Sequence, residues 1–189
     1  MKITVKELLQ RYASGERNFS YTDLSGLDLS RANLSRGSFV CTKLENTNFS
    51  SANLSRVRFE RNEIRNCNFS GANLQGASLA EAGIFDSNLK KAKLDEFCMI
   101  EAVIESCNME GASLRNADLG DSTIGRTNLR NANLEGCRGE MCMGNVNLTG
   151  ATGFDPNLVV AGCWDLTLPN GRVIVDWLTE EVWPIDMSS

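Results

Sequence analysis

The sequence predicts an all-β solenoid with four flat sides, a short α-helix covering its N-terminal end and an irregular C-terminal tail. A large apolar residue recurs at every fifth position from Phe19 to Leu134, and a small residue often precedes it by two places. Five residues advance an α-helix by about 140° net, and they alternate the faces of a strand. These side chains therefore share one inward direction only if the backbone turns every five residues.

A longer period of twenty residues predicts the number of sides. The clearest column, which we call the leucine ladder, consists of Leu34, Leu54, Leu74, Leu94, Leu114 and Leu134. An alanine stands two positions before each of these leucines. Such columns indicate that each residue stacks on the residue twenty positions later, so that one coil has four five-residue sides. Six regular coils are expected over residues 17–136.

The remaining positions of each repeat predict the corners and the outer surface. Serine, threonine, asparagine and glycine are abundant there and favour turns. One column of asparagines is expected to form a hydrogen-bonded ladder: Asn48, Asn68, Asn88, Asn108 and Asn128. Phe97 is too large for its small-residue position and is expected to distort that side.

Residues 1–16 are predicted to form a helix over the first coil, because an uncovered solenoid end exposes unpaired backbone. Thr4 and Glu7 have the spacing of a capping box, and Gly15 is suited to end the helix. The expected apolar face consists of Val5, Leu8, Leu9 and Tyr12.

The pattern becomes irregular after residue 136. Gly139 occupies a core position, and the next large apolar residue in the pattern, Leu148, arrives one place early. A distorted last coil is expected over residues 137–153, which extends the repeat region to 17–153.

The tail, residues 154–189, contains a predicted hairpin over residues 166–175 around Asn170-Gly171. Trp164, Trp177 and Trp183 make the tail rich in aromatic residues. Two interpretations stay open: the tail covers the last coil, or it forms a homodimer contact. They are compatible, so the chain is expected to be a monomer or a homodimer through this tail.

Composition argues against most enzymatic chemistry. Histidine is absent, and the seven cysteines contain no Cys-x-x-Cys pair. We expect no catalytic, cofactor-binding or metal site. No apolar run approaches the ~20 residues of a membrane span, and the opening MKITVKELLQ lacks the apolar core of a secretory signal. A cytoplasmic protein is therefore expected.

Five-residue units such as Arg31-Ala32-Asn33-Leu34-Ser35 and Asn131-Ala132-Asn133-Leu134-Glu135 resemble those of the pentapeptide-repeat family. The resemblance covers about residues 17–153 and implies a right-handed quadrilateral β-helix. The leader, residues 5–19, is similar to the openings of cyanobacterial members, including a regulator of heterocyst differentiation.

Three apolar residues in outward positions are the candidate partner-binding patch: Phe85, Ile100 and Val103. Scattered surface apolar residues are the ordinary alternative. Four arginines form a candidate anion site or, interleaved with Glu60 and Glu63, a mixed surface: Arg56, Arg58, Arg61 and Arg65.

Carboxylates and cysteines are the remaining candidate functional residues. Five carboxylates on exterior corners lack a cleft for acid–base catalysis: Asp95, Glu96, Glu101, Glu105 and Glu110. Cysteines near the irregular end leave a disulfide or redox role open: Cys137, Cys142 and Cys163. Cys67 and Cys107 are two coils apart, too far for a disulfide, and are interpreted as small core residues.

The leading functional hypothesis is a non-enzymatic scaffold or regulatory module that presents flat faces to a protein partner of unknown identity, without binding nucleic acid. The alternative is a DNA mimic that inhibits or protects DNA gyrase, as the resemblance to quinolone-resistance members implies. A mimic needs a continuous negative face. Here seven of the twenty-four acidic but only two of the nineteen basic residues lie beyond residue 136, so residues 1–136 are balanced.

Overall fold

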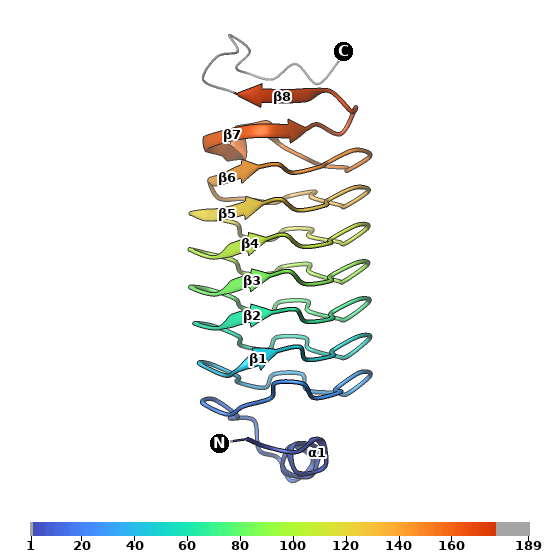
Figure 1. The fold of residues 1–189 in the computed structure, drawn as a ribbon, viewed down its shortest axis with the longest axis vertical. Helices are drawn as coiled ribbons and strands as arrows, with labels where there is room; N and C mark the ends of the chain where they lie inside the picture. The colour runs from blue at the N-terminus through green and yellow to red at the C-terminus, as the bar shows by residue number, and fades with distance from the viewer. Residues whose placement is uncertain (1, 177–189) are drawn as a thin grey trace.

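The computed structural model describes residues 2–176 and is a rod of stacked coils (Figure 1). Helix α1, Val5–Ala13, lies across one end of the rod, and the hairpin of β7 and β8 lies at the other. Two of the tail tryptophans that the sequence singles out, Trp177 and Trp183, lie outside the described residues. The fold class predicted from the sequence, an all-β solenoid with one short N-terminal helix, is confirmed.

One side of the rod carries the regular strands, in an eight-stranded sheet ordered from β1 to β8. The strands are β1 Leu44–Glu45, β2 Glu63–Arg65, β3 Gly83–Phe85, β4 Val103–Glu105, β5 Ser122–Gly125, β6 Met141–Gly144, β7 Val159–Thr167 and β8 Val173–Asp176. Strands β1 to β7 pair in parallel, and β8 returns antiparallel to β7. From β1 to β5 each residue pairs with the residue twenty positions later.

The other three sides are held by isolated bridges with the same offset of twenty. Examples from the three sides are Ser38 with Arg58, Asn48 with Asn68, and Asn53 with Asn73. Because all four sides share one offset, the coil is a four-sided unit of twenty residues, as the columns predict.

The inward side chains form one continuous core. Every leucine of the leucine ladder is at most 2% exposed. Phenylalanines stack in the first coils, with ring centroids 5.6 Å apart between Phe19 and Phe39 and 5.1 Å apart between Phe49 and Phe69. Aromatic pairs at these distances stabilise a core beyond their buried area.

The predicted distortion at Phe97 is wrong. Its ring is buried, and the backbone bonds from Cys98 N–H to the Ala77 carbonyl and from Asp118 N–H to the Phe97 carbonyl are 2.9 and 2.8 Å long. The positions directly below and above it in the stack are Ala77 and Ala117, both fully buried. These small neighbours leave the volume that the ring fills.

The corners place the backbone in the left-handed region two residues after each core side chain. Non-glycine examples are Arg36 with φ of 61° and Glu101 with φ of 55°. A turn at every fifth residue demands this conformation, which costs about 1–2 kcal/mol in a non-glycine residue. Charged residues as well as asparagine and glycine therefore occupy the corners, and they project outward.

Polar residues in the small inward positions donate hydrogen bonds to carbonyl groups at open corners, where no backbone N–H bonds back across the turn. At closed corners an N–H bonds back across the turn, as from Ala52 to the Phe49 carbonyl at 3.0 Å. At open corners a side chain from the coil above reaches the carbonyl instead. Asn62 Nδ2 donates to the Phe39 carbonyl at 2.7 Å, and Thr47 Oγ1 donates to the Leu24 carbonyl at 3.0 Å. These buried polar groups thus satisfy buried carbonyls.

The asparagine column mainly shapes turns. Each Oδ1 accepts the backbone N–H two residues on, for example from Ser50 to Asn48 at 3.1 Å and from Lys90 to Asn88 at 3.1 Å. A side-chain bond along the column joins Asn128 to Asn108 at 3.2 Å. The predicted ladder is therefore largely a backbone ladder whose side chains form Asx turns.

Helix α1 begins as predicted, with Thr4 Oγ1 accepting the Glu7 N–H at 3.2 Å. Gly15, with φ of 99°, follows its end. Leu8 is fully buried, but Leu9 is 38% exposed and does not belong to the buried face, which is a correction to the prediction. Ile3 is buried instead, because residues 2–3 pair with the first coil before the helix begins.

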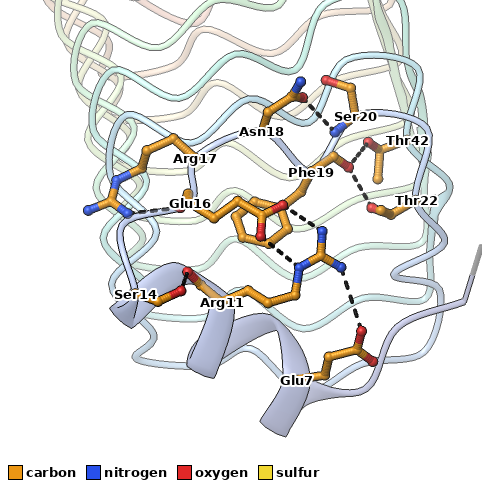
Figure 2. A network of polar contacts seen from close by, with 10 residues as sticks. All are labelled: Glu7, Arg11, Ser14, Glu16, Arg17, Asn18, Phe19, Ser20, Thr22 and Thr42. Carbon is orange, nitrogen blue, oxygen red and sulfur yellow. Dashed lines mark hydrogen bonds and ion pairs between the residues drawn. The ribbon is translucent and has the colours of Figure 1, made fainter.

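A charged network ties α1 to the first coil (Figure 2). Arg11 Nε donates to Glu16 at 2.8 Å, and its guanidinium lies 3.6 Å from Glu7. The Arg11 guanidinium also lies 5.4 Å from the centroid of the Phe19 ring, and Arg17 Nη1 of the first coil donates to the Tyr12 carbonyl at 2.8 Å. The helix is therefore held to the stack by polar contacts as well as by Leu8.

The last coil is one residue shorter than the others. The register changes from twenty to nineteen between Asp118–Arg138 and Ser122–Met141. Gly139, with φ of 93°, passes so close to Gly120 that a Cβ on it would lie 2.4 Å from the Gly120 nitrogen. The last coil therefore lies in close backbone contact with the sixth coil at this point.

The described part of the tail stacks on the last coil. It contains the 3-10 helix η1, Pro156–Leu158, and the predicted hairpin, whose strands pair Leu166 with Ile174. Leu166, Leu168 and Ile174 are buried against the coil. This part of the tail covers the end of the solenoid, while a homodimer contact stays a prediction.

Candidate protein-interaction face

The side that carries β1 to β6 is the candidate interaction face, and we call it the strand face. Its inward side chains are Leu44 and the isoleucines at 64, 84, 104 and 124, followed by Met143, all at most 2% exposed. Strand residues on either side of these point outward, because successive side chains alternate. The strand face is therefore the place where outward apolar side chains would be held most rigidly.

Three hollows run along the strand face parallel to the rod axis. Their volumes are about 220, 440 and 360 Å³ from the N-terminal coil onward. Neighbouring hollows share lining residues: Cys41 and Lys43 join the first to the second, and Arg61, Asn62 and Glu63 join the second to the third. The hollows form one shallow groove that crosses the strands from Tyr21 to Val103. Small residues behind the corners form its floor, such as Thr42 and Ala82.

Phe85 and Val103 line the third hollow together. One edge of the Phe85 ring lies over Gly83, where a Cβ would be 2.3 Å from the ring. The Arg65 guanidinium lies 4.2 Å from the centroid of the same ring. Val103 is the register partner of Gly83. The glycine therefore makes room for an aromatic surface that is partly open to solvent.

Ile100 lies elsewhere. It is 36% exposed and belongs to the adjacent side, where it lies over Gly120 with its Cγ1 3.9 Å from a Cβ built there. The corner residue Glu101 separates it from the strand face. The structure thus brings two of the three predicted patch residues together and places the third around a corner.

The arginine cluster is largely paired. Arg58 lies 2.7 Å from Glu60, Arg61 lies 3.0 Å from Glu81, and Arg65 lies 3.3 Å from Glu63. The Arg58 guanidinium lowers the pKa of the Glu60 carboxyl below its usual value. These pairs favour the interpretation as a mixed surface, and each contributes little stability because it is exposed.

Three of the five carboxylates considered for catalysis have structural partners. Glu110 lies 2.9 Å from Lys90, and Asp95 accepts the Arg115 N–H at 3.1 Å and the Ser113 hydroxyl. Arg126 Nε lies 2.7 Å from Glu105 Oε1 but directs no hydrogen bond at it among the described residues, so this contact is an ion pair only.

Residues 2–176 contain neither a metal-binding cluster nor a membrane-spanning helix. No group of three or more histidine, cysteine or carboxylate side chains is arranged to hold a metal ion within this range. Within the same range, none of the helices has the length and apolar character that crossing a bilayer requires.

No disulfide joins any of the seven cysteines, all of which lie within residues 2–176. Burial raises the pKa of Cys67, Cys107 and Cys137 to about 11. Two of these thiols complete open corners, with Cys67 Sγ 3.0 Å from the Leu44 carbonyl and Cys107 Sγ 3.5 Å from the Ile84 carbonyl. They are core residues with a structural hydrogen bond, which agrees with the prediction for Cys67.

The unfolding free energy is expected to fall as the pH rises from about 9 to about 11. The buried thiols have a pKa near 11 when folded and 9.0 as the reference value for an unfolded chain. Between these values the unfolded state loses protons that the folded state keeps, so stability present below pH 9 is lost, by at most ~1.4 kcal/mol per pH unit and thiol. Urea titrations at several pH values measure this slope. Cys67→Ala/Cys107→Ala is expected to flatten it, and an unchanged slope contradicts the prediction.

The structure also shows an apolar surface at the C-terminal end of the strand face. Trp164 is 46% exposed and lies over Gly144, where a Cβ would be 2.2 Å from the indole. Val173 and Val175 of the edge strand β8 are 50% and 63% exposed. The tryptophans of the tail indicate an aromatic surface at this end from the sequence alone. The role of Gly144 beneath the indole can be recognised only when the register of the strands is known.

Comparison with known proteins places this architecture in a family. A family model described as "Pentapeptide repeat region" matches residues 17–89. A second family model, described as "Pentapeptide repeats (8 copies)", matches residues 84–121 and 98–136. No curated protein matches the sequence.

Solved structures of other proteins are similar to this chain. Rfr23, a pentapeptide-repeat protein from the cyanobacterium Cyanothece 51142, is 18% identical, with a TM-score of 0.52 over 74% of this chain and 96% of its own. HetL, from Nostoc sp. strain PCC 7120 and involved in heterocyst differentiation regulation, is 21% identical, with a TM-score of 0.49 over 91% of this chain and 100% of its own. QnrB1, a plasmid-mediated fluoroquinolone resistance protein, is 17% identical, with a TM-score of 0.47 over 76% and 79%. The family models together span residues 17–136, and the chain belongs to the pentapeptide-repeat family.

Proposed function

We propose that this protein is a non-enzymatic interaction module of the cytoplasm, whose strand face binds a protein partner. The observation that supports this best is the groove of three joined hollows that reaches the partly exposed Phe85 and Val103. A rigid sheet holds both side chains in place, so a partner binds them without an ordering cost on this side.

The chemistry of the groove suits a protein surface. Buried aromatic and aliphatic anchors ringed by polar groups carry most of the affinity in protein interfaces. Around Phe85 and Val103 the rim is charged, with Arg61, Glu81 and Glu101 lining the same hollow. The rim therefore supports specificity, and the apolar floor supports affinity.

Affinity capture with tagged protein from lysate of the source cells tests the proposal. Phe85→Ser/Val103→Ser is expected to lower the enrichment of a specific partner at least ~10-fold, which corresponds to about 1.4 kcal/mol. Ile100→Ser is the matched control, because it makes the same chemical change on the adjacent side. The proposal is contradicted if Ile100→Ser lowers the enrichment of the partner as much as the double variant does. It is also contradicted if the double variant enriches the partner as strongly as the wild type.

A gyrase-directed DNA mimic is the weaker alternative. Arginines interleave with carboxylates on the first coils, as in Arg58–Glu60 and Arg61–Glu81, which interrupts a negative face. A supercoiling assay distinguishes the two functions, and inhibition or protection of gyrase at micromolar protein would favour the mimic.

A homodimer through the tail is a separate proposal. It is supported by three exposed side chains, those of Trp164, Val173 and Val175. It is also supported by β8, which is the last strand of the sheet among the described residues. Edge strands readily pair with a second chain. Sedimentation at several concentrations tests it, and Val175→Lys is expected to leave only monomer.

A further inference from the structure

A fourth hollow, on the side of the leucine ladder, is lined by arginines that differ from those of the strand face in their ion pairing. It has a volume of about 300 Å³ and is lined by Arg36, Ser55, Arg56, Asn73, Gln75 and Glu96. Arg36 and Arg56 occupy the same corner of consecutive coils, so their backbones are about 4.8 Å apart. Among residues 2–176, no carboxylate lies within ion-pair distance of either guanidinium.

Two like charges stacked in this way repel each other. Elsewhere on the rod a carboxylate relieves such a charge, as Glu81 does for Arg61 one coil away. The corresponding position above Arg56 is Gly76, which has no side chain to offer. An anion held between the two guanidinium groups would provide the missing counter-charge, and a phosphate fits because each planar guanidinium can donate two parallel hydrogen bonds to it.

Gly76 makes room for the Arg56 side chain that lines the hollow. A Cβ at this position would lie 3.4 Å from Arg56 Cγ, so the arginine side chain leans over the glycine. The same corner column carries Glu96 and Asn116 at positive φ, which shows that this backbone tolerates larger residues. A substitution at Gly76 therefore tests the hollow without forbidding the fold.

The two ends of the hollow differ in charge. Arginine side chains line one end, and Glu96, two coils beyond Arg56, lines the other. Gln75 and Ser55 lie between them and supply an amide and a hydroxyl. Asn73 is already fixed, with its Nδ2 3.4 Å from Asn53 Oδ1 and its Oδ1 accepting the Gln75 N–H at 3.1 Å. The carboxylate disfavours a second phosphate at the far end and favours an ammonium or hydroxyl group there.

We infer that this hollow binds a small phosphomonoester that carries an ammonium or hydroxyl group at its other end. The phosphate lies between Arg36 and Arg56, and Glu96 accepts hydrogen bonds from the opposite end of the ligand. The site is on a different side of the rod from the groove of the proposed function, so either can fail alone.

Titrations with inorganic phosphate and with phosphoethanolamine, followed by calorimetry and by the Gln75 side-chain amide signal in NMR spectra, test the assignment. Saturable binding of both probes is expected, and phosphoethanolamine is expected to bind ~3–10-fold more tightly. Arg36→Ala/Arg56→Ala is expected to weaken both at least ~10-fold. Glu96→Gln is expected to abolish the preference for phosphoethanolamine, and Gly76→Asn is expected to weaken the binding of both probes by displacing the Arg56 side chain.

Arg31→Ala/Arg130→Ala is the matched control, because it removes two exposed arginines that do not line the hollow. Binding by this control should equal that of the wild type. An equal loss in the control, equal affinity of the wild type for the two probes, or no saturable signal up to ~10 mM in low salt would overturn the assignment. Circular dichroism of each variant establishes that the rod is folded.

Discussion

Replacing Phe59 with alanine is expected to lower the free energy of unfolding by about 3–5 kcal/mol. The Phe59 ring is fully buried, and its centroid lies 5.5 Å from that of Phe39, 5.9 Å from Phe49 and 6.2 Å from Phe69. Alanine would leave a cavity on the axis of the third coil, and the regular coils on either side restrict its collapse. Urea unfolding followed by circular dichroism measures the loss.

Phe59→Leu is the matched variant, since Leu79 occupies the next position of the same column. It is expected to cost about 1.5 kcal/mol, because most of the volume remains. Each coil contacts mainly its neighbours, so increased amide exchange should centre on coils two to four. A loss below ~1 kcal/mol for the alanine variant, or a uniform change in exchange along the rod, contradicts this account of the core.

Replacing Gly139 with alanine is expected to cost about 3–5 kcal/mol, from strained backbone at positive φ and from overpacking. The added Cβ would lie 2.4 Å from the Gly120 nitrogen and 2.6 Å from its Cα, which are backbone atoms that cannot rotate away. Relief of this contact requires the last coil to separate from the sixth, and the tail stacks on that coil. Thermal and urea unfolding both measure the effect.

Gly120→Ala is the control on the other side of the same contact. Its Cβ would meet its nearest neighbour, the Asp118 carboxylate, at 3.5 Å, which is ordinary van der Waals contact. This variant is expected to stay within about 0.5 kcal/mol of the wild type. Equal stability of the Gly139 and Gly120 variants would show that the last coil does not depend on close backbone approach.

The core and the number of sides were predictable because they depend on a local property repeated many times. Each five-residue unit carries its own inward side chain, so the leucine ladder follows from the period without knowledge of distant contacts. The hairpin around Asn170-Gly171 was predictable for a similar reason, since turn residues act locally. Errors occurred where a neighbouring coil decides the outcome. Phe97 fits because Ala77 and Ala117 lie below and above it, and Leu9 is exposed because residues 2–3 direct Ile3 into the core.

The sequence by itself determined that this protein is a four-sided rod with a leucine-rich axis and without histidine. Only the tertiary structure decided which surface residues meet. It separated Ile100 from Phe85 by a corner and paired Arg61 with Glu81. It also placed Arg36 and Arg56 where no carboxylate of residues 2–176 lies within ion-pair distance. The physical reason is the range of the interactions. Inward direction is set within five residues, whereas charge pairs, hollows and exposed rings form between side chains about twenty residues apart, where one glycine in the next coil changes the result.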